Sequence, residues 1–335
     1  MDLNKIFIKN ASPTKVGGQA VLDGIMMKGE DRTAVVVRFP DKTMHIKTEM
    51  LPEKKAWTKL PMFRGVFMFV SALVTGTKTL MYSAEVVESY DGEGAEVYED
   101  DKLTLFLEKK FGEKGAWNVM LYSAVVIALV ITVGVFIIAP TWVVNFCKYF
   151  TTNEIALNLI EGVFRIALFV LYVVLISKMK DIQKVFQFHG AEHMCIHCYE
   201  NKLELTPENC NQFYTLHPRC GTSFLMFVMV ISLILFSLLG WPDLFWRITS
   251  RLLLIPVIAG LSYELLRWAG RSDSLAVRIL SLPGLYLQKL TTRRPDENQL
   301  EVAIAAMKAV LVDKQEPCIE GLCDKEGRLI AQVEQ

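Results

Sequence analysis

The sequence lacks an excess of charge of either sign, because 36 lysines and arginines balance 36 aspartates and glutamates in 335 residues. Such a chain has no strong overall field to attract nucleic acid or an acidic partner, so neither is indicated. The first ten residues lack the apolar core of roughly 7 to 15 residues that marks a signal peptide, so we expect none to be removed. The seven cysteines lack a disulfide-like framework, which favours reduced thiols on a cytosolic face.

Apolar residues, by contrast, are abundant and unevenly placed. They make up 52% of the chain and gather in long runs. A helix needs roughly 20 apolar residues to cross a hydrocarbon core about 30 Å thick. We therefore predict four membrane-spanning helices, at about 117–144, 157–176, 223–239 and 248–268. The second contains Glu161 and Arg165, four residues apart, where an ion pair lowers the cost of each charge.

Basic residues in the connections predict the orientation, because lysine and arginine are retained on the cytoplasmic side. The connections between spans one and two and between spans three and four contain one each, Lys148 and Arg247. The other connections contain Lys109, Lys110, Lys114, Lys178, Lys180, Lys184, Lys202, Arg219, Arg267, Arg271 and Arg278. We therefore predict a multi-pass protein of the cell membrane, surrounded by membrane lipids, with both termini in the cytoplasm.

The predicted fold is mainly α, a polytopic membrane protein with about four transmembrane helices, a small N-terminal β-hairpin region and cytosolic amphipathic helices. Residues 1–60 are glycine-rich and include a hairpin, since 34–39 and 43–48 alternate around a Pro40-Asp41-Lys42 turn. Residues 61–116 hold a re-entrant or interfacial helix and an acidic linker. Residues 117–282 form the membrane domain, with a cytosolic His/Cys segment at 178–221. Residues 283–335 hold an amphipathic helix N-capped by Asp296, and a tail.

Four of the five histidines lie within residues 189–217, between the second and third predicted spans. On a helix, His189 and His193 are i and i+4, so their imidazoles lie one above the other and can share a metal ion. The order His-x-x-Glu-His is that of inverted zinc hydrolases, in which the intervening glutamate takes a proton from the water that the metal activates. This pattern gives Glu192 a catalytic role.

A third ligand must come from elsewhere in the chain. His217 and Cys220 are the nearest in sequence, and Glu200 and Glu264 are further options. The imidazole nitrogens that face away from the metal also need hydrogen-bond acceptors, which Asp23 or Glu200 could supply.

Structural roles compete with these chemical ones. A single histidine is more often a packed or capping residue than a ligand, but the set of His189, Glu192, His193 and His217 favours metal, and the roles of His197 and Cys220 stay open. The C-x-x-C of Cys195 and Cys198 lacks a redox-fold context, so ordinary structural residues are favoured there. The pair Cys318 and Cys323 is weak evidence for metal. Glu264 is placed equally well to pair with Arg267 or to function in the site.

Together these motifs resemble the YqhQ-type family of bacterial membrane proteins, which are described as candidate metal-dependent enzymes. The residues that carry the resemblance are Gly17-Gly18-Gln19-Ala20-Val21 with Gly24 and Met26-Met27, Arg64-Gly65, Phe188-His189-Gly190-Ala191-Glu192-His193, Tyr199-Glu200, His217-Pro218-Arg219-Cys220-Gly221-Thr222 and Glu301-Val302-Ala303. Met194 stands where the family commonly has lysine, and Asp23 where glutamate is more usual. The family pattern does not include His197 or Cys198, so neither is expected as a ligand on this ground.

We therefore expect a membrane-embedded metal-dependent hydrolase with its site at the cytoplasmic membrane surface. Zinc suits histidine and cysteine ligands, Glu192 would be the general base, and Arg219 could stabilise an oxyanion. The substrate could be a peptide bond or a lipid-linked ester. The alternative is a non-catalytic scaffold or membrane-protein biogenesis factor, with a membrane-protein partner and a structural metal. An open site with three ligands favours the enzyme, and a closed site with four favours the scaffold.

Overall fold

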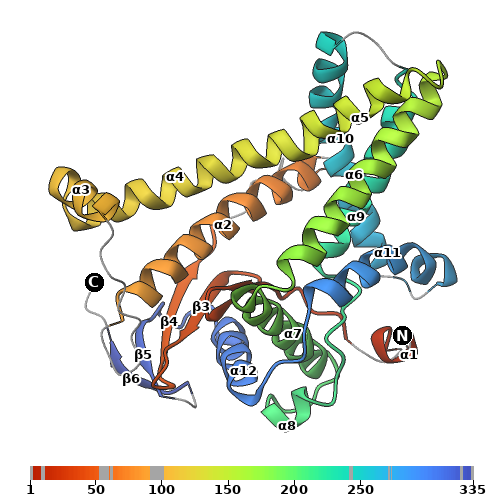
Figure 1. The fold of residues 1–335 in the computed structure, drawn as a ribbon. Coiled ribbons are helices and arrows are strands. Elements are labelled where there is room, and N and C mark those ends of the chain that lie inside the picture. Colours follow the sequence, from red (N-terminus) through yellow and green to blue (C-terminus); the bar gives the residue numbers. More distant parts are fainter. Residues whose placement is uncertain are drawn as a thin grey trace. The chain divides into compact units, whose positions relative to one another are not determined.

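The structure is a computed structural model, and it describes residues 3–8, 12–52, 60, 63–90, 102–240, 244–270, 272, 274–324 and 327–332. The chain forms two compact units (Figure 1). The first contains Met1–Glu93, Val170–Ser232 and Asp243–Gln335, and the second contains Gly94–Phe169 and Leu233–Pro242. Each unit is described by itself below.

The first unit contains an antiparallel sheet with strand order β1-β2-β3-β4-β5-β6. Its strands are Gly17–Val21, Gly24–Lys28, Arg32–Arg38, Met44–Met50, Glu320–Cys323 and Leu329–Gln332. The predicted hairpin is confirmed, since β3 pairs with β4 in a register that places Val36 opposite Ile46. The sheet is larger than predicted, because the Gly17–Gly24 segment forms β1 and its turn, and the C-terminal tail adds β5 and β6.

Helices cover both faces of this sheet. Neighbouring residues of a strand point to opposite faces, and Ala34 and Val36 of β3 belong to the core that α7 (Lys180–Glu200) and α12 (Glu297–Leu311) cover. On the other face, Val37 packs with Phe39 and with Val86 near the end of α2 (Phe63–Glu88). The helix α7, which bears the histidines, is therefore fixed against β1, β2 and α12 (Figure 1).

The predicted C-terminal helix and its cap are confirmed. Asp296 accepts a hydrogen bond from the backbone N–H of Gln299, and the Gln299 side chain accepts one from the backbone N–H of Asp296. This capping box satisfies two of the backbone donors that the first turn of α12 would leave unpaired. The remaining helices of the first unit are α1 (Leu3–Ile6), α8 (Pro207–Cys210), α10 (Leu244–Ala269), α11 (Leu275–Thr291) and most of α9 (Gly221–Ser237), whose residues from Leu233 onward belong to the second unit.

The second unit is helical in the part of it that the structure describes. Its elements are α3 (Lys102–Phe111), α4 (Glu113–Val133), a π-helical segment (Gly134–Ile138), α5 (Ala139–Cys147) and the first part of α6 (Glu154–Ile176). The expected ion pair within α6 is confirmed, since Arg165 donates to the Glu161 carboxylate one helical turn away. The predicted acidic linker differs in part, because 102–111 form α3, while 91–101 lie outside the described residues.

In the part of the chain that the structure describes, four helices are long and apolar enough to cross a membrane, as predicted, although the set differs. They are Arg64–Glu88, Asn118–Cys147, Glu154–Ile176 and Thr249–Ala269. Three of them correspond to predicted spans, whereas the predicted span at 223–239 is the shorter helix α9. The additional helix is α2, which continues from the apolar run at 65–77 to Glu88.

The contacts of α2 favour the interfacial position that the sequence predicts for it. Near its start, Gly65 lies against Gly260 of α10, so closely that a Cβ would meet the Gly260 Cα at 2.8 Å. Three turns later, Gly76 contacts the Gln19 side chain of β1, which donates to the Gly76 carbonyl. The first turns of α2 therefore lie beside the apolar helix α10, and its later turns lie beside the sheet.

Candidate metal centre

The helix α7 carries the histidine motif, as its spacing predicts. It is helical from Lys180 to Glu200, so His189 and His193 lie one turn apart, with ring centroids separated by 4.5 Å. The motif faces the loop at 215–220, which precedes α9, and the C-terminal end of α11. The site therefore joins three segments that are distant in the sequence.

A first group of ligand-type side chains consists of His189, His193 and Cys220. One ligand atom from each lies within 4.8 Å of the others. The His189 Nε2 is 3.2 Å from the Cys220 Sγ. Two imidazole nitrogens and a thiol sulfur at this separation are suitable ligands for a soft or borderline metal ion such as zinc.

Backbone carbonyls fix the orientation of both imidazoles in this group. The Nδ1 of His189 is 2.8 Å from the Thr291 carbonyl oxygen, and the Nδ1 of His193 is 2.6 Å from that of Thr215. Because a carbonyl only accepts, each Nδ1 carries the proton and donates it, which leaves the lone pair of a neutral ring on Nε2. Metal-binding histidines are usually oriented by an outer hydrogen bond of this kind.

His193 presents the clearest sign of a missing ligand. Its side chain is 1% exposed, and its Nε2 is buried without a hydrogen-bond partner among the residues that the structure describes. A buried polar atom of this kind costs free energy, on the order of 1–3 kcal/mol, unless something binds it. A metal ion shared with His189 and Cys220 would satisfy this nitrogen.

The electrostatics of the group favour the thiolate form of Cys220. Burial alone would raise the pKa of this thiol, but His193 and His189 outweigh burial and hold the pKa well below its usual range. Burial would likewise lower the pKa of His189, but the neighbouring Cys220 raises that pKa to about 9. Cysteine binds a metal ion as the thiolate. A metal ion at this site would take the place of the proton that His189 and Cys220 share.

Glu192 lies beside this group on the adjacent face of α7. Its side chain is buried and lies against Gly18 of β1, where a Cβ would be 3.0 Å from the Glu192 Cδ. Burial raises the pKa of Glu192, although His193 and His189 oppose that shift. A carboxylate with a raised pKa is a stronger base, which suits proton transfer near neutral pH.

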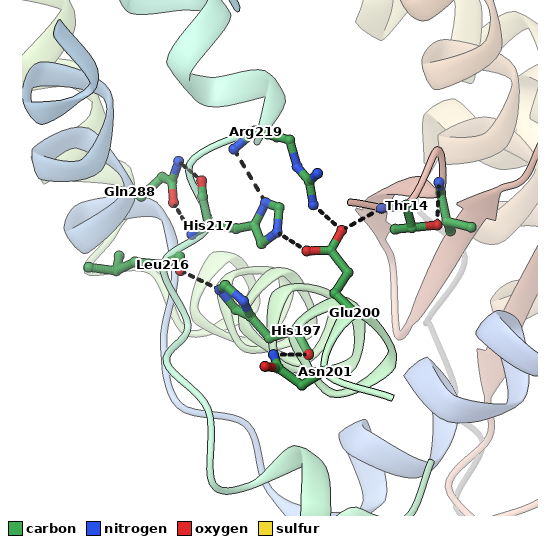
Figure 2. Close-up of polar contacts among 9 residues, drawn as sticks. Thr14, His197, Glu200, Asn201, Leu216, His217, Arg219 and Gln288 are labelled. Carbon is green, nitrogen blue, oxygen red and sulfur yellow. Dashed lines mark hydrogen bonds and ion pairs between the residues drawn. The ribbon is translucent and has the colours of Figure 1, made fainter. Parts of the chain in front are cut away.

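A second group, drawn in Figure 2, consists of His197, Glu200 and His217, one turn further along α7. Glu200 forms an ion pair with Arg219 and accepts a hydrogen bond of 2.9 Å from the backbone N–H of Thr14. The Nε2 of His197 lies 3.0 Å from the Leu216 carbonyl.

The second group satisfies its own hydrogen bonds. Burial lowers the pKa of His197 to about 4 and the pKa of His217 well below its usual range, so both rings are neutral. The His217 Nδ1 accepts from the Arg219 backbone N–H, so its proton lies on Nε2, 3.6 Å from Glu200. This network has fewer lone pairs available for a metal than the first group, and it holds the loop in place.

Gln288 of α11 fixes the same loop from the other side. Its amide oxygen accepts from the His217 backbone N–H at 2.9 Å, and its amide nitrogen donates to the His217 carbonyl at 2.9 Å (Figure 2). The side chain is fully buried, so both bonds are protected from water. Gln288 thus places the loop that carries Cys220 opposite the histidines of α7.

The structure therefore brings together most of the residues singled out in the sequence. Cys220 lies in one group with His189 and His193, and His217 lies in the second group. The ring centre of His217 is nevertheless only 5.7 Å from that of His193, and Arg219 is bound to Glu200. Asp23 lies apart, in the turn after β1, 3.8 Å from Lys184. The acceptors for the two imidazoles are backbone carbonyls of Thr215 and Thr291, which sequence reasoning missed because a backbone group leaves no signature in the sequence.

The contacts also place three other residues or pairs. Glu264 pairs with Arg64 of α2 through two hydrogen bonds, and it belongs to neither of the two groups. Cys195 and Cys198 are buried in the core between α7 and α12, as a structural role would require. Cys323 lies in β5, away from both groups.

A family profile described as "Protein of unknown function (DUF1385)" matches residues 60–313, which include α7, the loop and α11. The chain belongs to this family. It is also 32% identical over 307 residues to the "Uncharacterized protein YqhQ" of Bacillus subtilis (strain 168), covering 90% of this chain and 94% of that protein. The resemblance to YqhQ-type proteins is thereby confirmed. No solved structure matches the chain.

The contact between β1 and Glu192 yields a first prediction. A Cβ at Gly18 would lie 3.0 Å from the Glu192 Cδ and 2.7 Å from the Met26 carbonyl, whereas a Cβ at Gly17 would meet nothing within 4 Å. We expect Gly18→Ala to displace the carboxylate and to reduce cellular function by about 100-fold, the effect of a catalytic group misplaced by about 1 Å. Metal content should be unchanged, because the three ligands are not touched.

Gly17→Ala is the matched control and should retain full function and metal. Complementation of a deletion strain, metal analysis and thermal unfolding of both purified variants are the measurements. Full function in the Gly18→Ala protein would show that the position of Glu192 is unimportant.

Proposed function

We propose that this protein is a membrane-embedded metal-dependent hydrolase that holds zinc with His189, His193 and Cys220 and uses Glu192 as general base. The observation that carries the proposal is the His193 Nε2, which is buried without a hydrogen-bond partner among the described residues and lies beside the His189 Nε2 and the Cys220 thiolate. Three protein ligands leave a position open, which is typical of catalytic rather than structural zinc.

In the proposed reaction the metal, when bound, supplies Lewis-acid activation of water. Glu192 accepts the proton that this water loses as its oxygen attacks the scissile carbonyl carbon, and delivers that proton to the leaving group when the bond to it breaks. The close packing of Gly18 against the carboxylate keeps Glu192 in place for both transfers. The carbonyls of Thr215 and Thr291 keep the two imidazoles in the ligand orientation.

Arg219 has a positioning role in this scheme. Its guanidinium binds Glu200, and its backbone N–H donates to His217, so it stabilises the loop that presents Cys220. The sequence also suggested that Arg219 stabilises an oxyanion during the reaction. This role stays a prediction, and it would fall to the guanidinium nitrogens that do not bind Glu200.

The scaffold alternative is less well supported by the contacts of the loop. A structural metal is needed where the chain cannot otherwise fix its ligands. Here Gln288, Glu200 and Arg219 already hold the loop through buried hydrogen bonds and an ion pair. A metal at the first group therefore has no obvious folding task.

An open coordination position separates the two accounts experimentally. In the purified protein loaded with Co²⁺, a small hydroxamate should bind the metal and change its visible absorption spectrum, because a three-ligand site has room for it. Cys220→Ser should shift the spectrum before hydroxamate is added, since a sulfur ligand is lost. A Co²⁺ spectrum that does not respond to saturating hydroxamate would indicate a closed site and favour the scaffold.

We further propose that both termini and the metal centre lie in the cytoplasm. Reporter fusions after Tyr149 and after Lys202 flank α6, so they should report opposite sides, outside for Tyr149 and inside for Lys202. An outside result at Lys202 would contradict both the proposed topology and the reduced state of the cysteines.

A further inference from the structure

The helix α11 has two faces of different chemistry. Its buried face holds Thr291, whose carbonyl orients His189, and Gln288, which fixes the loop that carries Cys220, together with Val277 and Leu285 of a small core. On the other face Leu275, Ile279 and Tyr286 are 73%, 57% and 58% exposed. These three lie along one stripe, because residues four and eleven positions apart share a helix face. The outward face of this helix is therefore apolar.

The contacts of α11 place it where apolar helices end. Gly284 packs against Ser223 in the first turn of α9, so closely that a Cβ would lie 2.9 Å from the Ser223 Cα. Ala269, the last residue of α10, belongs to the same core as Val277 and Leu285. Just after α11, Arg293 donates at 2.8 Å to the carbonyl of Ser177, which follows the end of α6.

Three apolar helices thus enter or leave at the level of α11, which is the expected level of a membrane surface. Basic side chains border the apolar stripe on this side. Lys289 is exposed, with its ammonium 5.2 Å from the centre of the Tyr286 ring, and exposed Arg293 and Arg294 follow. An apolar stripe with a basic and aromatic rim is typical of a helix that lies in the interface of an anionic membrane.

We propose that α11 lies in the membrane–water interface with its stripe of Leu275, Ile279 and Tyr286 in contact with lipid, and that the substrate is a lipid-linked ester. The first part stands on the contacts of α11. The second rests on the proposed function, because the centre is held by the opposite face of the same helix. The diameter of one helix, about 10–12 Å, then separates the centre from the lipid. At that distance from the lipid, the metal centre can reach an ester bond that lies near the lipid headgroups.

Photo-crosslinking tests the interface position independently of any activity. A benzophenone amino acid is placed at Ile279 or Tyr286 of the full chain in membranes, and at Lys308 on the exposed side of α12 as the control. After illumination, mass spectrometry should find phospholipid adducts at 279 and 286 and none at 308. Adducts to another protein, or no lipid adduct at either position, would overturn the proposal.

The same membranes test the substrate class. Lipid extracts incubated with the metal-loaded protein should lose one ester-linked species and gain its products, and the Glu192→Gln protein should change neither. If lipid adducts form but no lipid ester is consumed, the interface position stands and the substrate class is wrong. Crosslinking should be unaltered in the Glu192→Gln protein, so the failure of the proposed function can be recognised separately.

Discussion

Replacing His193 by alanine should remove about one equivalent of bound metal, because a site reduced to two protein ligands holds zinc far more weakly. His193 is the ligand whose Nε2 is buried without a hydrogen-bond partner among the described residues, and its other nitrogen is already fixed by the Thr215 carbonyl. The measurement is elemental analysis of the purified protein after exhaustive dialysis against a metal buffer. Cellular function should fall to the level of a deletion strain.

His197→Ala is the matched control, since His197 is also buried on α7 but belongs to the second group. Its Nε2 donates to the Leu216 carbonyl, so the variant should lose loop stability and retain its metal. Loss of the metal in His197→Ala together with its retention in His193→Ala would assign the metal to the second group.

Elements that depend on local chemistry could be predicted from the sequence. The Pro40-Asp41-Lys42 turn identified the hairpin, Asp296 identified the start of α12, and the i, i+4 spacing of His189 and His193 placed both on one helix face. Each of these signals arises from residues within one turn of each other. The place of β5 and β6 in the sheet could not be found in this way, because β5 pairs with β4 across more than 250 residues of chain and β6 joins the sheet only through β5.

The extent of α2 shows a second limit. The sequence showed a short apolar run with polar interruptions, and hydropathy alone did not indicate that the helix continues to Glu88. The continuation depends on packing, since Tyr82 and Val86 contact the sheet while the first turns lie beside α10. Tertiary contacts thus extend a helix that local propensity leaves undecided.

The ligand set of the centre was predictable only in part. The sequence identified His189, His193 and Glu192 because their spacing is meaningful on a helix. The choice between His217 and Cys220 depends on how the loop folds, and that fold is set by the Gln288 amide 71 residues from His217 in the sequence. Which neighbour of His189 completes the group therefore followed from the structure alone.

Replacing Glu192 by glutamine should abolish cellular function while leaving the metal in place. Glutamine has nearly the same size and can pack against Gly18 in the same way, but it cannot take a proton from water. General-base catalysis typically contributes about 10²–10⁴-fold to a rate, so the loss should be of that order. The three ligands are unchanged, and the unfolding temperature of the variant should stay close to that of the unmodified protein.

The most direct test of a metal-dependent hydrolase is complementation of a deletion strain by Glu192→Gln, with metal content measured on protein purified from the same cells. The proposed mechanism predicts a full equivalent of metal and no complementation. A protein that contains its metal and complements fully would contradict the mechanism, because a structural metal needs its ligands but not a neighbouring base.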